Sequence, residues 1–296
     1  MNKTIAYLKL MRPANIVTSI ADVLAGVAIS GFFMQQGLLA DWILPLILLC
    51  ISTIGLYGGG VVFNDVFDAE LDKIERPERP IPMGIITIKE ATLLGIILLL
   101  MGIITAFFVN LVSGFLATII AVSAIVYNKW GKHRSFLGPL NMGLCRGLNL
   151  LLGVSILVTQ LNLYWYVAIV PIIYIASITM ISRGEVHGGK SQSLYFAGLL
   201  YILVILSILF ISFYNKSEFL TLLFLFPFAA MIFIPLVKAI RQPVGKNIGK
   251  AVKAGVIALI FLNASWASAF GSTGLAFLIL LLMPLSLYLA KKFSVT

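Results

Sequence analysis

Charged residues are scarce in this chain: they make up 11% of its 296 residues, whereas 60% are hydrophobic. A soluble domain carries roughly 25% charged residues, so the composition excludes an ordinary soluble fold. Cysteine is scarcer still, with only Cys50 and Cys145, both inside apolar runs. Their placement excludes a disulfide framework and a cysteine-ligated metal site, and we interpret both as packing residues.

Long polar connections are also missing, which leaves no room for a separate soluble domain. Apolar runs of about 20 residues, the length of a transmembrane helix, fill the chain instead. We therefore predict an all-α, polytopic transmembrane helical bundle that forms a single domain over residues 1–296. The ten predicted spans cover residues 14–34, 42–63, 87–109, 112–128, 136–158, 163–182, 193–213, 218–240, 248–268 and 271–290.

The basic residues predict the orientation of these spans, because Lys and Arg gather in cytoplasmic loops. With a cytoplasmic N-terminus, all of the 21 basic residues except Arg146 and Lys216 fall on the cytoplasmic side. Both chain ends are then cytoplasmic, and topology explains the net charge of +10 without a nucleic-acid partner. We expect an integral protein of a bacterial inner membrane whose first span is retained rather than cleaved as a signal peptide.

The few acidic residues are clustered: five of the 11 lie within twelve residues at the cytoplasmic end of the second span. On a helix, Asn64, Asp68 and Asp72 share one face, with Asp65 beside them, whereas Glu70 points elsewhere. Like charges at this spacing repel one another, which favours a bound divalent cation. Oxygen ligands without Cys or His suit Mg²⁺. The alternative is a solvated helix end where acids collect.

Two arginines follow the acidic window directly. The segment "RPERPIP" places Arg76 and Arg79 beside the carboxylates and stiffens the loop with prolines. Guanidinium groups match phosphate oxygens, while metal-bound carboxylates clamp the same group from the other side. Acids, a cation and arginines together indicate a diphosphate site.

The acidic window and the segment that follows it resemble a motif of a known family. "NDVFDAELD" followed by "RPERPIPMG" resembles the first Asp-rich motif of the UbiA superfamily of intramembrane prenyltransferases. "LMRPANIV", "YNKW" and "GPLNMGLCRGLNLLLG" are similar to its first helix, the end of its fourth helix and its fifth helix. The resemblance implies a helical bundle with a lateral opening to membrane lipid. It also implies Mg²⁺-dependent transfer of a prenyl group from a prenyl diphosphate to an acceptor, which the sequence does not identify.

The resemblance also implies roles for individual residues. The implied metal ligands are Asn64, Asp65, Asp68 and Asp72. The implied diphosphate-binding residues are Arg76, Arg79 and Lys129, and we add Arg183 and Lys190 of the altered second motif to them. The implied catalytic residues are Asp68 and Asp72, and we add Arg146 from its depth in a span and Glu185 from the altered second motif.

The second motif departs from the family pattern. Where a second Asp-rich motif is expected, the chain reads "SRGEVHGGKS", with Glu185 as its only carboxylate; this variant resembles EboC-like members. Arg183, Lys190 and backbone amides replace the lost charge in one explanation, with Glu185 serving a single metal. In another, His187 is a base toward an unusual acceptor, although we favour an ordinary interfacial histidine. In the third, the second site has degenerated and catalysis is lost.

Arg146 lies about ten residues into the fifth span, where a charge is costly and normally faces a polar cavity or a partner. We expect it in the cavity wall, with Asn149 on the same helix face; the alternative is a side chain that snorkels to the interface. Two G-x-x-x-G pairs, starting at Gly55 and Gly143, predict close helix packing.

The second and sixth spans run in parallel and each ends in a polar motif, so we expect both motifs at one cavity mouth. The family fold has nine helices, whereas the charge pattern gives ten.

A second function class also fits: a lipid or isoprenoid carrier or transporter, or a non-catalytic membrane subunit, that retains half of a diphosphate site. A transporter is expected to place polar residues in both halves of the membrane. Here the polar motifs lie on the cytoplasmic side, which favours the enzyme.

Overall fold

The structure is a computed structural model that describes residues 2–34, 39–132, 134, 137–185, 188 and 191–293. Over these ranges the chain is helical and contains no strand, which confirms the predicted all-α fold. The helices, in chain order, are α1 (Lys3–Met11), α2 (Pro13–Ile29), η1 (Phe32–Met34), α3 (Leu39–Phe67), α4 (Ala69–Glu75), α5 (Ile88–Phe107), α6 (Leu111–Val126), η2 (Tyr127–Gly131), α7 (Leu137–Val154), α8 (Val158–Tyr164), η3 (Trp165–Ala168), α9 (Ile169–Ser182), α10 (Ser191–Tyr214), α11 (Glu218–Arg241), α12 (Gly245–Ala269), α13 (Thr273–Leu280) and α14 (Leu282–Lys292).

Eight helices of the described chain are long and apolar enough to cross a membrane, or up to nine when the bent pair α1–α2 counts as one span. The protein is therefore a polytopic membrane protein. All ten predicted spans are found as helical segments, including 271–290, which forms α13 and α14. Helix α7 is not among the candidate spans. Three polar side chains reduce the hydropathy of this helix: Asn141, Arg146 and Asn149.

A bend of 42° separates α1 from α2. Arg12 at the bend has a left-handed backbone with φ of 49°, and Pro13 is the first residue of α2. Proline has no N–H group to continue the hydrogen bonding of α1 but is well suited to begin a new helix. The bend leaves the Arg12 side chain free to reach α3.

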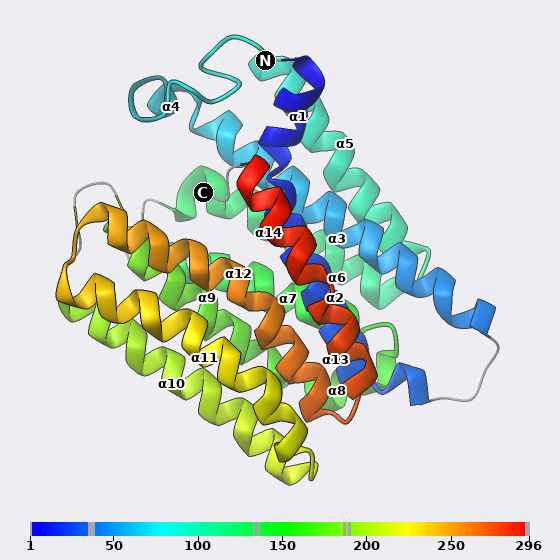
Figure 1. The fold of residues 1–296 in the computed structure, drawn as a ribbon. Coiled ribbons are helices and arrows are strands. Elements are labelled where there is room, and N and C mark those ends of the chain that lie inside the picture. Colours follow the sequence, from blue (N-terminus) through cyan, green and yellow to red (C-terminus); the bar gives the residue numbers. More distant parts are fainter. Residues whose placement is uncertain are drawn as a thin grey trace.

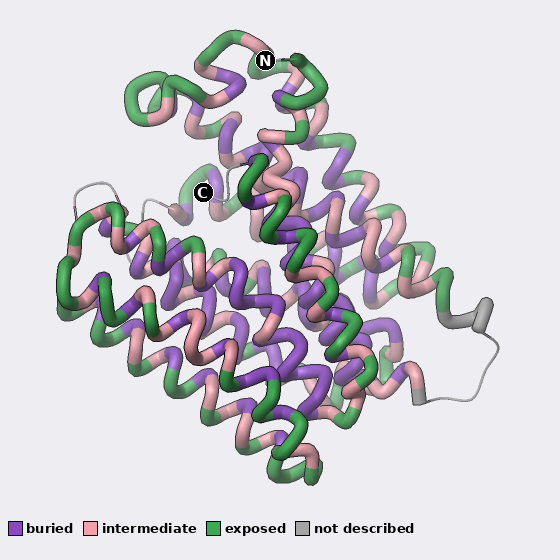
Figure 2. The backbone as a smooth tube through the Cα atoms, viewed as in Figure 1, coloured by how far each residue is buried: buried purple, intermediate pink, exposed green. Residues whose placement is uncertain are grey.

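Helix α2 is the centre of the bundle. Nearly all of its residues are buried, and it packs against α3, α7, α12, α13 and α14. Figure 1 shows α14 running along α2, with α10 and α11 on one side of the molecule and α3 and α5 on the other. In Figure 2 the buried residues gather where these helices meet.

Glycines allow the closest of these contacts. A Cβ atom added to Gly26 of α2 would lie 2.7 Å from the backbone nitrogen of Val154 and 2.8 Å from Cα of Gly153, both in α7. Only glycine fits there, and the contact holds α2 and α7 at a short distance. Both predicted G-x-x-x-G pairs also pack closely: an added Cβ at Gly55 would lie 2.8 Å from the backbone nitrogen of Gly102, and at Gly143 2.5 Å from a carbonyl oxygen of α9.

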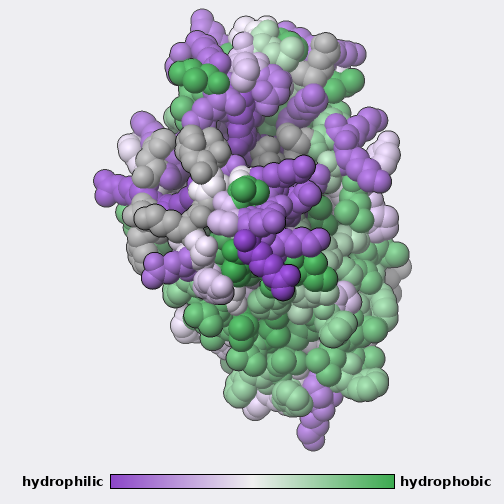
Figure 3. Space-filling view, turned by 60° about the vertical axis from the view of Figure 1, so that its left-hand side comes forward, coloured by the Kyte–Doolittle hydropathy of each residue, from purple (hydrophilic) through white to green (hydrophobic). Residues whose placement is uncertain are grey.

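The outer surface matches a membrane environment. Large hydrophobic side chains are exposed along α3, α5, α6, α10 and α11. Figure 3 shows hydrophilic side chains gathered at the end of the molecule that carries α1 and α4, while hydrophobic side chains cover most of the rest of that face. Helices satisfy their own backbone hydrogen bonds, so this surface is compatible with lipid.

Candidate functional site

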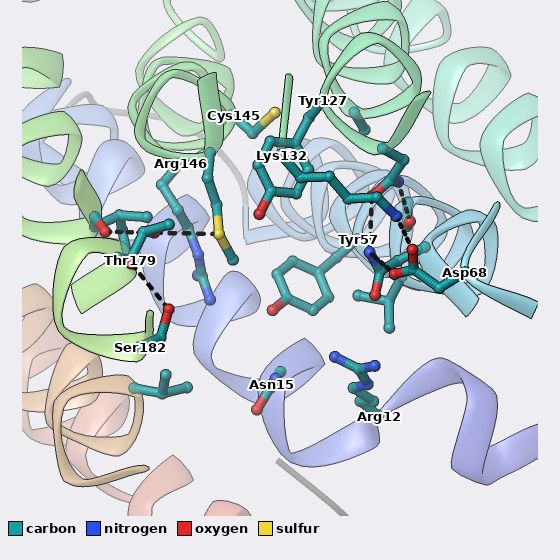
Figure 4. A pocket seen from close by; sticks show the side chains of 18 of the residues that line it. Arg12, Asn15, Tyr57, Asp68, Tyr127, Lys132, Cys145, Arg146, Thr179 and Ser182 are labelled. Carbon is teal, nitrogen blue, oxygen red and sulfur yellow. Dashed lines mark hydrogen bonds and ion pairs between the residues drawn. The ribbon is translucent and has the colours of Figure 1, made fainter. Parts of the chain in front are cut away.

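A cavity of about 410 Å³ lies among α2, α3, α4, α6, α7, α9 and α12 (Figure 4). One end is polar, and its lining includes Asn64, Asp68, Asp72, Glu75, Arg76, Arg79 and Glu185. Both polar motifs therefore meet at one cavity, as predicted from the parallel second and sixth spans. The rest of the lining includes apolar residues of α3, α6, α9 and α12, among them Leu56, Ile120, Ile175 and Val256.

The acidic window is helical on both sides of a break at Asp68. Helix α3 ends one residue before it and α4 begins one residue after it. The backbone nitrogens of Asp68 and Asp72 still donate to the carbonyl oxygens four residues earlier, at 3.0 and 2.8 Å. The helical spacing therefore persists, and Asn64, Asp68 and Asp72 all line the cavity. Glu70 points away, with its side chain 79% exposed and paired with Lys73 at 2.7 Å.

Two arginines are fixed by buried carboxylates. Arg12 donates from Nη2 to Oδ1 of Asp65 at 2.9 Å. Arg79 donates from Nη1 to Oδ1 of Asp65 at 3.1 Å and to Oδ2 of Asp72 at 2.6 Å. Asp65 is only 4% exposed and is not among the residues that line the cavity. Its carboxylate therefore positions the two arginines from behind.

A second ion pair holds Asp68. Lys132 donates from Nζ to Oδ1 of Asp68, and Asn64 donates from Nδ2 to Oδ2 of Asp68 at 3.2 Å. Asn64 also donates to Oδ1 of Asn128 at 3.2 Å, and Asn128 donates to the carbonyl oxygen of Gly60 at 2.7 Å. This chain of polar contacts joins the end of α3 to the segment after α6.

The structure does not bring Lys129 to the cavity. Its side chain is exposed and its Nζ lies 4.6 Å from the centre of the Trp130 ring. The cause is a π-helical turn at Tyr127–Gly131, where the Lys132 backbone nitrogen donates to the carbonyl oxygen five residues earlier at 3.0 Å. The wider turn directs Lys132 into the cavity, while Lys129 points outward. Such turns are local insertions that apolar periodicity does not predict.

The residues of the second motif lie on different sides of the cavity wall, with Glu185 facing the cavity and Arg183 facing away. Glu185 lines the cavity, and burial raises the pKa of its carboxyl group above the ordinary value, against a smaller opposing effect of Arg76. Arg76 lines the same end of the cavity. Arg183 is exposed and donates from Nη2 to the carbonyl oxygen of Arg134 at 3.0 Å, so it does not face the cavity. Two further residues of this motif lie outside the described residues: His187 and Lys190.

The donor set suits Mg²⁺ in a particular way. Asn64, Asp68 and Asp72 bring hard oxygen atoms to one wall of the cavity. Within the described residues, no three His, Cys, Asp or Glu side chains gather closely enough to hold an ion by themselves. Magnesium often binds through one or two carboxylates together with substrate phosphates and water. Asp68 and Asp72 fit that arrangement, with Asn64 beside them.

Arg146 lies deeper and has a buried partner rather than a path to the interface. It is 6% exposed, lines the cavity and forms an ion pair with Asp22 of α2. Asn149, on the same face of α7, donates to Asp22 at 3.1 Å. The snorkelling alternative for Arg146 is therefore wrong.

Several residues of the site were not predicted from the sequence: Arg12, Asp22, Tyr57, Asn128 and Lys132. The pairing of Asp22 could have been predicted, because an acidic residue inside a predicted span needs a partner, and so does Arg146. Arg12 lies in the stretch "LMRPANIV" that resembles the family, but its contact with Asp65 depends on the bend before α2.

Comparison with known proteins gives a consistent result. Residues 24–253 match the model of the UbiA prenyltransferase family. The digeranylgeranylglyceryl phosphate synthase of Saccharolobus solfataricus is 34% identical over 151 residues, which is 50% of this chain and 50% of that relative. The match thus spans about half the length of that curated relative.

Two solved structures share the fold. A structure described as digeranylgeranylglyceryl phosphate synthase in membranes has a TM-score of 0.66 at 23% identity and covers 92% of this chain and 100% of that chain. A UbiA homologue from Archaeoglobus fulgidus, bound to DMAPP and Mg²⁺, has a TM-score of 0.62 at 16% identity and covers 86% of this chain and 98% of that chain. At these identities the two structures establish the fold.

Proposed function

The chain belongs to the UbiA prenyltransferase family, and from that membership we propose that it transfers a prenyl group from a prenyl diphosphate to an acceptor within the membrane. One observation carries the proposal. A single cavity has Asp68 and Asp72 facing Arg76 and Lys132 at its polar end, while much of the remaining lining is apolar. This cavity suits a diphosphate at the polar end and an isoprenoid chain along the apolar walls.

Three cations are placed to bind the diphosphate: Arg76, Arg79 and Lys132. Lys132 replaces Lys129 in this role. The ion pairs of Arg79 and Lys132 hold both side chains near the site before substrate arrives, so less side-chain entropy is lost on binding. Lys190 keeps its proposed role, while Arg183 is not part of the proposed site.

We propose Mg²⁺ as the cofactor, held by Asp68 and Asp72 with Asn64 beside them. When bound, Mg²⁺ neutralises negative charge that develops on the leaving diphosphate. Asp65 supports this group by fixing Arg12 and Arg79.

The transfer breaks one bond and forms another. The C1–O bond of the allylic diphosphate breaks, and its electron pair leaves with the diphosphate. A nucleophilic atom of the acceptor bonds to the resulting cation at C1 and releases its proton. Arg76, Arg79 and Lys132 stabilise the charge on the departing diphosphate. The apolar walls exclude water that would otherwise capture the cation.

Glu185 is the remaining acid of the second motif, and we propose that it faces the diphosphate end of the cavity together with Arg76. Burial raises the pKa of Glu185, and the nearby Arg76 offsets the repulsion between its carboxylate and a diphosphate. Of the explanations for the altered motif, charge replacement thus rests on Arg76 rather than Arg183.

The setting of the protein is also proposed. The variant "SRGEVHGGKS" supports an EboC-like member of the family. The distribution of basic residues supports a cytoplasmic N-terminus and a site at the cytoplasmic side. We propose a bacterial inner membrane as the location.

A carrier that binds the diphosphate without turnover is the second candidate. The observation that favours it is that Asp68 and Asp72 are already paired with Lys132 and Arg79, while the second motif offers a single acid among its described residues.

Purified protein incubated with Mg²⁺, radiolabelled prenyl diphosphates and a membrane lipid extract separates the two functions. A labelled lipid product supports the transferase, and tight binding without product supports the carrier. Asp68→Ala is expected to abolish Mg²⁺-dependent diphosphate binding in folded protein. Glu70→Ala is the matched control, because Glu70 is exposed on the far side of α4. Binding that persists unchanged in EDTA would contradict the metal site.

A further inference from the structure

The buried ion pair below the diphosphate site forms a second polar station in the same cavity. Arg146 of α7 pairs with Asp22 of α2, and its Nη2 donates to Oγ1 of Thr18 at 2.7 Å. The guanidinium carbon lies 4.9 Å from the centre of the Tyr57 ring. Ion pair, hydroxyl and ring hold the arginine in one position.

This station is distinct from the diphosphate site in depth. Tyr57 and Thr53 lie on α3, seven and eleven residues before Asn64. At a rise of 1.5 Å per residue they are about 10 and 16 Å deeper along the helix axis. Thr53 donates to Oδ1 of Asn149 at 2.7 Å, which places Asn149 at the deeper level. A diphosphate held at Asp68 and Asp72 does not reach that level.

The station is neutral as a whole. Asp22 accepts from Arg146, from Nδ2 of Asn149 at 3.1 Å and from Nδ2 of Asn263 at 2.7 Å. Asp22 is 2% exposed and is not among the residues that line the cavity. The cavity therefore meets the N–H donors of Arg146, while its charge is compensated from behind.

Donors without net charge select a particular ligand. A guanidinium carries five N–H groups, more than its contacts with Asp22, Thr18 and Tyr57 use, so a neutral oxygen atom gains a hydrogen bond here. An anion would lose its hydration at a station whose positive charge Asp22 already balances, which costs free energy. Among the described residues that line the cavity, the other cations belong to its diphosphate end: Arg12, Arg76, Arg79 and Lys132. In Figure 4, the Arg146 side chain and the ring of Tyr57 project into the same part of the cavity from α7 and α3.

We infer that this station binds the acceptor, and that the acceptor is a lipid with a neutral oxygen head group, such as a hydroxyl, rather than an anionic one. The inference rests on the proposed function, because it assigns the diphosphate to the other end of the cavity. Arg146 and Tyr57 then hold the head group while the apolar walls hold the lipid chain.

A matched pair of probes tests the charge preference. The protein in nanodiscs is first saturated with Mg²⁺ and the unreactive geranylgeranyl S-thiolodiphosphate, so that a probe phosphate finds the polar end occupied. Binding of 1-O-hexadecylglycerol is then compared with binding of its 3-phosphate. We expect the neutral probe to bind at least ten-fold more tightly.

Three variants report on the cause. Asp22→Asn leaves Arg146 uncompensated and is expected to shift the preference toward the phosphate at least ten-fold. Asn263→Ala removes a hydrogen bond to the same carboxylate without changing charge, and is expected to keep the neutral preference. Arg146→Gln is expected to weaken binding of the neutral probe at least ten-fold. If Asp22→Asn does not fold, the comparison of the neutral and phosphate probes in the natural protein still tests the inference.

The outcomes separate this inference from the proposed function. Suppose that the thiolodiphosphate binds saturably and depends on Mg²⁺. The inference alone is then overturned if the phosphate probe binds as tightly as the neutral probe or more tightly, or if neither probe binds. Absence of thiolodiphosphate binding overturns the proposed function and the inference together.

Discussion

At the scale of single residues, the charges at the polar end of the cavity are arranged in pairs that a substrate has to separate. Asp68 contacts Lys132, and Asp72 contacts Arg79 at 2.6 Å. A diphosphate that arrives with Mg²⁺ offers each half a new partner, since the carboxylates turn to the metal and the cations to the phosphates. We therefore expect the diphosphate and Mg²⁺ to bind cooperatively, each raising the affinity for the other.

Lys132 and Lys129 offer a direct test of this arrangement. Lys132→Met is expected to weaken Mg²⁺-dependent binding of geranylgeranyl S-thiolodiphosphate at least ten-fold, because a cation at the phosphates is lost. Lys129→Met removes the same charge from an exposed side chain stacked on Trp130 and is expected to change affinity less than two-fold. Calorimetric titration of both variants measures the difference. Equal losses in the two would contradict the placement given by the π-helical turn.

Glu185 provides a test that depends on pH. Burial raises the pKa of Glu185 above its unfolded value, so its ionised form is disfavoured in the folded protein. The stabilising contribution of the protonated form is then fully present below the unfolded pKa and is lost as pH rises through the folded pKa. Glu185→Gln is expected to match the natural protein in melting temperature at pH 4 and to exceed it at pH 8. A melting temperature below that of the natural protein at pH 8 would show that the ionised carboxylate stabilises the fold.

Part of the site is predictable from the sequence at this scale. Asn64, Asp68 and Asp72 were found because helical spacing alone places them on one face. Arg79, the partner of Asp72, was also predicted beside these carboxylates. Two other cations of the site were not, because Lys132 reaches Asp68 through a π-helical turn and Arg12 reaches Asp65 through a bend. Asp22 and Arg146 are 124 residues apart in sequence, and each is visible only as a charge that needs a partner.

At the scale of elements, the helices follow from the apolar runs, whereas the breaks between them create the site. The bend at Arg12 and the turn at Tyr127–Gly131 each direct a polar side chain into the cavity. The bend has a clear signal in the sequence, which is Pro13. The π-helical turn has none that apolar periodicity encodes.

The crossing of α2 and α7 is the contact that brings Asp22 to Arg146. Gly26→Ala would place a methyl group against backbone atoms of α7. A side chain can change its rotamer to relieve such a clash, whereas backbone atoms cannot. Overpacking of this kind costs about 1–3 kcal/mol, and we expect a lower melting temperature in detergent together with weaker binding of the neutral probe. Gly274→Ala in α13 is the control, because an added Cβ there meets no atom within 4 Å. An unchanged melting temperature for Gly26→Ala would contradict the close crossing.

At the scale of the whole molecule, the cavity and the basic residues belong to the same end. Figure 3 shows hydrophilic side chains concentrated at the end that carries α1 and α4. Helix α4 contributes Asp72 and Glu75 to the lining of the cavity. A diphosphate is too polar to cross the bilayer, so its site has to open toward the compartment that supplies it. The orientation of the bundle therefore decides which pool of prenyl diphosphate the protein uses.

Site-directed labelling tests that orientation. In a variant with Cys50 and Cys145 replaced by alanine, single cysteines are introduced at Asn110 and Lys216, in loops following α5 and α10, and at Lys246 and Lys292. Because Lys and Arg gather on the cytoplasmic side, a membrane-impermeant maleimide is expected to label the first two in intact cells and the last two only after permeabilisation. The reverse pattern would place the cavity mouth outside and remove its access to cytoplasmic diphosphates. Labelling at Lys292 from outside, with the other three as expected, would mean that α13 and α14 do not cross the membrane together and that the charge pattern overcounts the spans by one.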